Sequence, residues 1–209
     1  MKASSDFAHN VFINCPIDPD YDPLFQAMVF TIHLLGFRVR CSREENDSGN
    51  IRLGKILKII GECRFGIHDI SRTELDKHGL PRFNMPFELG VDLGIRRCGN
   101  RRFRTKVHLI LDRTPYRYQH FLSDIGGQDI DAHYNKPKRV ITNVRDWLRS
   151  ATKANDMPSG KIIFGEYKRF LRDLPAICQR LNLDIREITF PDYSHIVVIW
   201  AKTEYQKKA

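Results

Sequence analysis

The chain lacks long apolar segments, cysteine-rich spacing and a leader-like start. No apolar run approaches the ~20 residues with which a helix crosses a bilayer, and residues 1–6 contain no apolar stretch of a secretory signal. The five cysteines are odd in number, scattered and free of C-x-x-C spacing, so we expect reduced thiols. Together these absences predict a soluble cytoplasmic protein without membrane contact.

Signatures of metal sites and of common hydrolases are also missing. The eight histidines show no metal-ligand spacing, and there is no G-x-S-x-G elbow. Residues 49–56 match the spacing of a phosphate-binding P-loop, but Ile56 stands where that loop needs Ser or Thr to hold magnesium. We therefore expect neither a metal site nor a resident cofactor.

Negative charge is the scarcer sign. The chain has 34 Lys and Arg against 25 Asp and Glu, a formal net charge of +9. This excess favours an anionic partner, either a phosphate-bearing small molecule or nucleic acid. The densest basic segment runs from Arg96 to Lys106, but no helix-turn-helix, zinc-finger or RNP pattern accompanies it. A solvated helix end and loop is the preferred interpretation of this segment, with a nucleic-acid surface as the alternative.

Strands and helices alternate through the first half of the chain. The apolar patterns predict strands over residues 11–15, 37–41, 64–70 and 106–111, with helices over 22–35, 50–62 and from 84 onward. This alternation is typical of a doubly wound parallel α/β sheet. The helix over 22–35 is apolar almost all round, so we expect it to be deeply buried.

The alternation breaks after residue 112. We expect a short helix over 115–122, an edge strand over 129–134, and helices over 138–152 and 161–181, with Pro175 kinking or splitting the latter. For residues 195–200 the β-branched residues favour a strand, but the helical stripe and the capping run before it favour a helix, which is preferred. Residues 1–112 are thus predicted to form an α/β core, and residues 113–209 a mainly helical extension packed on it. Whether the extension completes the sheet, covers the crevice or forms a homo-oligomer stays open.

The most informative stretch is residues 82–94, whose pattern is typical of a loop followed by a helix. We expect Asn84 to cap this helix, and the helix dipole to keep Glu88 ionised. Gly90 and Gly94 leave one face bare, so that face could lie close to a sheet. Glu88, Asp92 and Arg96 fall at i, i+4 and i+8, and patterning alone favours a solvated charged face.

Other candidates lie on the loops that follow the predicted strands, where ligands of such sheets bind. Asp69 ends the third strand, so the fold could bring it and Glu88 to one crevice. Asp47, Ser48 and Gly49 precede a helix whose free N–H groups suit a phosphate, with Arg52 in its first turn as a clamp. Further candidates for substrate binding are Asn84 and, after the first strand, Cys15, Asp18 and Tyr21.

These segments carry a resemblance. The runs Val11–Pro16, Asp47–Gly49 with Arg52, Ile67–Ser71 and Met85–Gly90 resemble the nucleoside 2-deoxyribosyltransferase-like and TIR-like superfamily over about residues 9–112. The resemblance implies a flavodoxin-like fold and cleavage of N-glycosidic bonds in nucleosides, nucleotides or NAD. It implies that Glu88 is catalytic and that Asp69 lines the sugar site. Several bacterial relatives act in anti-phage defence.

The residue types suit that chemistry. A carboxylate can stabilise or capture the oxocarbenium-like sugar that forms when the bond breaks. Nicotinamide leaves NAD as a neutral base, whereas a purine or pyrimidine needs a proton from Asp69 or Asp47. Tyr21 and Phe83 either stack on a base or pack the loops, and packing is preferred. The alternative function is a non-catalytic nucleotide-sensing or adaptor module with the same fold.

Overall fold

The computed structural model describes residues 4–205 except 46, 48, 50, 76 and 77. Its centre is a sheet of five parallel strands in the order β2-β1-β3-β4-β5. The strands are β1 (Asn10–Asn14), β2 (Arg38–Cys41), β3 (Phe65–Asp69), β4 (Val107–Asp112) and β5 (Ile130–Ala132). This is the strand order of flavodoxin-like doubly wound folds, so the predicted fold class is confirmed.

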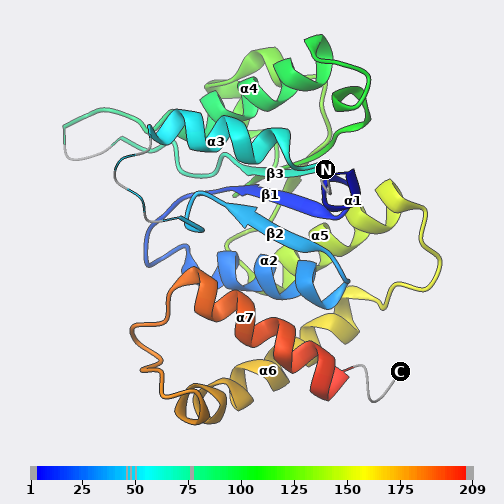
Figure 1. The fold of residues 1–209 in the computed structure, drawn as a ribbon. Coiled ribbons are helices and arrows are strands. Elements are labelled where there is room, and N and C mark those ends of the chain that lie inside the picture. The colour runs from blue at the N-terminus through cyan, green and yellow to red at the C-terminus, as the bar shows by residue number, and fades with distance from the viewer. Residues whose placement is uncertain (1–3, 46, 48, 50, 76–77, 206–209) are drawn as a thin grey trace.

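Helices cover both faces of the sheet. Helices α3 (Arg52–Gly61) and α4 (Asn84–Cys98) lie on one face, and α2 (Asp22–Leu34) and α5 (Pro137–Thr152) lie on the other (Figure 1). Successive side chains of β1 point to opposite faces of the sheet. Val11 and Ile13 pack in the hydrophobic cluster around α2, and Phe12 packs in the cluster around α3.

Two further helices form an outer layer. Helices α6 (Gly160–Arg180) and α7 (Phe190–Trp200) pack against α5 and α2 on the side away from the sheet (Figure 1). The ring of Phe30 in α2 lies 5.2 Å from Phe170 and 5.6 Å from Trp200, between centroids. Helix α2 is therefore enclosed by the sheet and by this layer, as its apolar sequence predicted.

Residues beyond 112 complete the sheet. The predicted edge strand is β5, which pairs with β4 from Ile110↔Ile130 to Asp112↔Ala132. The predicted short helix before it is two 3₁₀ turns, η2 (Arg117–His120) and η3 (Ser123–Ile125). The α/β layer thus continues past the predicted core boundary, and α6 and α7 are the part of the extension that lies outside it.

Pro175 does not split α6. The helix runs unbroken through it, and Pro175 is exposed, so the carbonyl that loses its intrahelical donor lies on the solvent side. Helix α7 starts at a capping box between Thr189 and Asp192, earlier than the sequence pattern predicted. The remaining short elements are α1 (Ser4–Phe7), η1 (Phe103–Thr105) and η4 (Ala201–Tyr205). All five cysteines are unpaired, and none of the described helices combines the length and apolarity needed to cross a bilayer.

Candidate active site at the carboxyl edge of the sheet

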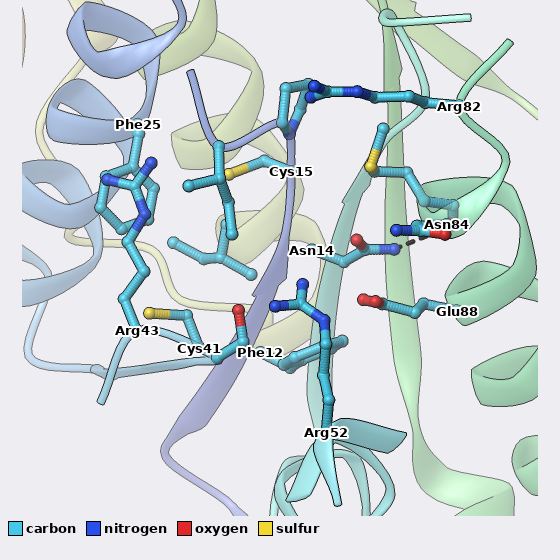
Figure 2. Close-up of a pocket in the computed structure, with 15 residues that line it drawn as sticks. Phe12, Asn14, Cys15, Phe25, Cys41, Arg43, Arg52, Arg82, Asn84 and Glu88 are labelled. Carbon is cyan, nitrogen blue, oxygen red and sulfur yellow. Dashed lines mark hydrogen bonds between the residues drawn. The ribbon is translucent and has the colours of Figure 1, made fainter. Parts of the chain in front are cut away.

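A cavity of about 150 Å³ opens where β1 and β2 end, beside the first turns of α3 and α4 (Figure 2). Ligands of open α/β sheets bind at this edge. A cavity of about this volume admits a benzene ring in another protein, so it suits a ring-sized group, with the rest of a larger ligand extending outward. The lining residues are Phe12, Ile13, Asn14, Cys15, Pro16, Ile17, Phe25, Cys41, Ser42, Arg43, Arg52, Arg82, Asn84, Met85 and Glu88.

Glu88 lies in the second turn of α4, with its carboxylate in the cavity and facing Arg52 (Figure 2). It is 8 % exposed, and among the described residues no hydrogen bond or salt bridge reaches its carboxylate. Burial raises the pKa of Glu88, and the nearby charge of Arg52 opposes that rise. Burial therefore acts against the ionisation that the helix dipole was expected to favour.

Two predictions for α4 are wrong: that Asn84 is its N-cap, and that the face with Gly90 and Gly94 lies close to the sheet. The N-cap is Phe83, without a side-chain hydrogen bond, and Asn84 is the first helical residue. Gly90 and Gly94 are exposed, with no atom within 4 Å of the position of an added Cβ. The bare face points to solvent because the opposite face carries the side chains that fill the space above the sheet.

The predicted solvated charged face is also wrong. Asp92 is fully buried against the sheet, with its Oδ2 3.2 Å from His68 Nε2 and its Oδ1 3.2 Å from both His108 Nε2 and Lys106 Nζ. Burial alone would raise the pKa of Asp92, but His108 and His68 hold it well below its usual range. Gly66 makes room, since an added Cβ would lie 2.8 Å from Asp92 Oδ2.

This network has the ligand types of a metal site. One atom each from His68, Asp92 and His108 lies within 4.8 Å of the others, a grouping that the sequence did not predict. Lys106 already supplies a positive charge there, since its ammonium also donates to the carbonyls of Ile60 (2.8 Å) and Cys63. The cluster is therefore a buried ion network that ties α4 to β3 and β4.

Asn14 joins this network to the cavity. Its Nδ2 donates to His68 Nδ1 (3.1 Å) and to the carbonyl of Met85 (2.9 Å). His68 thus accepts at Nδ1 and presents Nε2–H to Asp92, and burial lowers the pKa of His68. Because both amide hydrogens of Asn14 are used, its Oδ1 remains as an acceptor on the cavity side (Figure 2). In the sequence Asn14 is only part of an apolar strand pattern, so it was not predicted as a site residue.

The structure does not bring Asp69 to this cavity. Its carboxylate is fully buried, and it accepts hydrogen bonds from Tyr21 Oη (2.5 Å) and from the backbone N–H of Ser71 (2.9 Å), with His133 Nε2 at 3.1 Å. Tyr21 is 2 % exposed and packs the loop, and Asp18 accepts from its backbone N–H (3.0 Å). These residues fasten the loop after β1 to β3 and to the end of β5.

Of the other predicted residues, Cys15, Arg52 and Asn84 share the cavity wall with Glu88. Burial, with the charge of Asp69, raises the pKa of the Cys15 thiol, which disfavours a thiolate. Asp47 is exposed and accepts from the backbone of Gly49, and neither residue lines the cavity. Ser48 lies outside the described residues.

Two arginines that were not predicted from the sequence, Arg43 and Arg82, complete the cavity wall. Arg43 contacts Asp22 (3.0 Å) and lies over the ring of Phe25 (4.6 Å to the centroid). No partner contacts Arg82 within the described parts of the chain. With Arg52, three arginines and one carboxylate line the cavity, so the site suits an anionic ligand. Spacing alone could not find Arg43 and Arg82, because they lie on two separate loops, after β2 and before α4.

No protein-family model, curated protein or solved structure matches the chain.

Proposed function

We propose that the protein cleaves or transfers across the N-glycosidic bond of NAD or another nucleotide, with Glu88 as the residue that reacts with the sugar. One observation carries this proposal: the Glu88 carboxylate lies in the wall of a ring-sized cavity, without a hydrogen bond or salt bridge from the described residues, beside arginines. The resemblance of the segments around Glu88 to the deoxyribosyltransferase-like and TIR-like superfamily supports the same reaction.

In the proposed reaction, the Glu88 carboxylate acts on the sugar as the N-glycosidic bond breaks. As the bond between the anomeric carbon and the base nitrogen breaks, its electron pair leaves with the base and the sugar becomes oxocarbenium-like. The Glu88 carboxylate stabilises this cation or forms an ester with the anomeric carbon. Water then completes hydrolysis, or a second base completes transfer.

The site is best suited to a substrate whose leaving group needs no proton. Glu88 is the only carboxylate in the described cavity wall, and both Asp69 and Asp47 lie elsewhere. Nicotinamide departs from NAD as a neutral molecule, whereas purines and pyrimidines need a general acid. This arrangement supports a nicotinamide nucleotide as substrate.

Recognition of such a substrate uses the other lining groups. Arg52 begins α3, so its guanidinium and the free N–H groups of that helix start favour a phosphate. Arg82 adds a second planar fork for phosphate oxygens. Asn14 Oδ1 accepts a hydrogen bond from a ribose hydroxyl.

The test is release of free base from NAD, deoxynucleotides and nucleosides, followed by chromatography. Release that is abolished by Glu88→Gln, which keeps the shape and removes the charge, supports the proposal. Glu187→Gln is the matched control, because Glu187 is exposed on the loop between α6 and α7. Binding without release from any substrate supports the nucleotide-sensing alternative, and absence of both contradicts an N-glycosidase.

A further inference from the structure

A second hollow lies at the other end of α4. It is lined by Leu93, Arg96, Arg97, Arg104 and Gln128, and we name it the basic groove. It shares no lining residue with the cavity, and the helical rise places Arg97 roughly 14 Å from Glu88 along the axis of α4. The basic groove is therefore a separate surface from the candidate active site.

The three arginines of the basic groove carry unneutralised charge. Asp92, which stands at i−4 to Arg96 and would be its helical partner, is turned toward the sheet and contacts Lys106 instead. No acidic residue lines the groove, and no hydrogen bond or carboxylate reaches Arg96, Arg97 or Arg104 from any described residue. All three side chains are exposed.

Several arginines elsewhere in the chain are paired with carboxylates. Arg113 lies 2.6 Å from Glu74, and Arg117 lies 2.6 Å from Asp112. In the basic groove, by contrast, three exposed arginines lie together without a carboxylate from the described residues. Such a cluster of positive charge favours binding of an anion.

The backbone around the groove holds these side chains in place. An added Cβ at Gly99 would collide with the carbonyl of Ile95 and the ring of Phe103, so only glycine allows the tight reversal after α4. Asn100 Oδ1 then accepts from the backbone N–H groups of Arg102 (3.0 Å) and Phe103 (3.3 Å). This turn folds η1 back against α4, so Arg104 lies in the same groove as the arginines that end the helix.

We propose that the basic groove binds the sugar-phosphate backbone of a nucleic acid, without reading its sequence. Guanidinium forks match phosphate oxygens in pairs. A membrane surface would need several exposed apolar side chains beside the charges, and Leu93 alone is apolar here. The groove is open and its arginines are exposed, so it suits repeated phosphates on a polymer rather than one enclosed nucleotide.

The test measures binding of the full chain to labelled duplex DNA, single-stranded DNA and single-stranded RNA over a range of salt concentrations. The variant is Arg96→Gln with Arg97→Gln and Arg104→Gln. The matched control is Arg149→Gln with Lys161→Gln and Arg180→Gln, which removes the same charge from exposed positions of α5 and α6. Circular dichroism and thermal unfolding verify that both variants fold.

For duplex DNA, three phosphate contacts contribute about −2.7 to the slope of log K against log salt, or about −2.1 for a single strand. We expect the groove variant to lose this part of the slope and to bind about tenfold or more weakly at low salt, while the control keeps the wild-type slope. Equal losses in both variants, absence of binding by the wild type at low salt, or binding to anionic vesicles or polyglutamate but not to nucleic acid would each overturn the proposal. Base release is measured in parallel, so failure of this proposal is separate from failure of the proposed activity.

Discussion

Replacing Gly66 by alanine is the most direct perturbation of the buried network behind the cavity. The added Cβ would lie 2.8 Å from Asp92 Oδ2 and 3.0 Å from both His108 Cδ2 and His68 Nε2. All three neighbours lie in a closely packed interior, so they cannot move away without breaking their contacts. Overpacking of this kind costs about 1–3 kcal/mol, and partial loss of the buried ion pair adds to that cost.

We therefore expect Gly66→Ala to lower the free energy of unfolding by about 2–4 kcal/mol. Gly90→Ala is the matched control, because Gly90 lies in the exposed part of α4 with no atom within 4 Å of its added Cβ. That change should stabilise the protein by about 0.5–1 kcal/mol.

The assay is urea unfolding followed by circular dichroism, with the m-value compared across the three proteins. A Gly66→Ala variant as stable as the wild type would refute the close packing of Asp92 against β3. Destabilisation by Gly90→Ala as large as that by Gly66→Ala would refute the exposed placement of the glycine face.

Three further predictions concern the buried network, the cavity and a buried histidine in α2. Asp92→Asn should destabilise the fold by about 3–5 kcal/mol in urea unfolding, because it leaves the Lys106 ammonium buried without a counter-charge; a change below about 1 kcal/mol would contradict the network. Arg52→Gln should move the acidic limb of the pH profile of base release to higher pH, since Arg52 lowers the pKa of Glu88; an unchanged limb would contradict their proximity. Burial lowers the pKa of His33 from its ordinary 6.5 to about 4, so the unfolded chain binds more protons and stability should fall as the pH drops from about 6.5 toward 4. His33→Gln should flatten that fall in thermal unfolding, and an equally steep fall in the variant would exclude His33 as its source.

The elements with local signals were predictable from the sequence. Pro23 and Gly36 bound a nearly continuous apolar run, and that run is the buried helix α2. The edge strand predicted over residues 129–134 is β5 (Ile130–Ala132). Each of these rests on residues close together in the sequence, where propensity and turn chemistry act directly.

The buried network was not predictable in that way. Glu88, Asp92 and Arg96 are spaced four residues apart, which places them on one face of a helix. This spacing is the same whether that face is buried or exposed, so it could not indicate the burial of Asp92. The burial of Asp92 depends on Gly66 and His108, which become neighbours only through the register of β3 and β4. Asp69 shows the same limit, because the end of a strand is visible in the sequence but the direction of its side chain is not.

Release of nicotinamide from NAD by the wild type and by Glu88→Gln, measured on proteins of equal thermal stability, tests the central claim most directly. The account predicts release by the wild type and a loss of at least about a hundredfold in the variant. Equal release by both proteins would contradict the assignment of Glu88 as the reacting carboxylate.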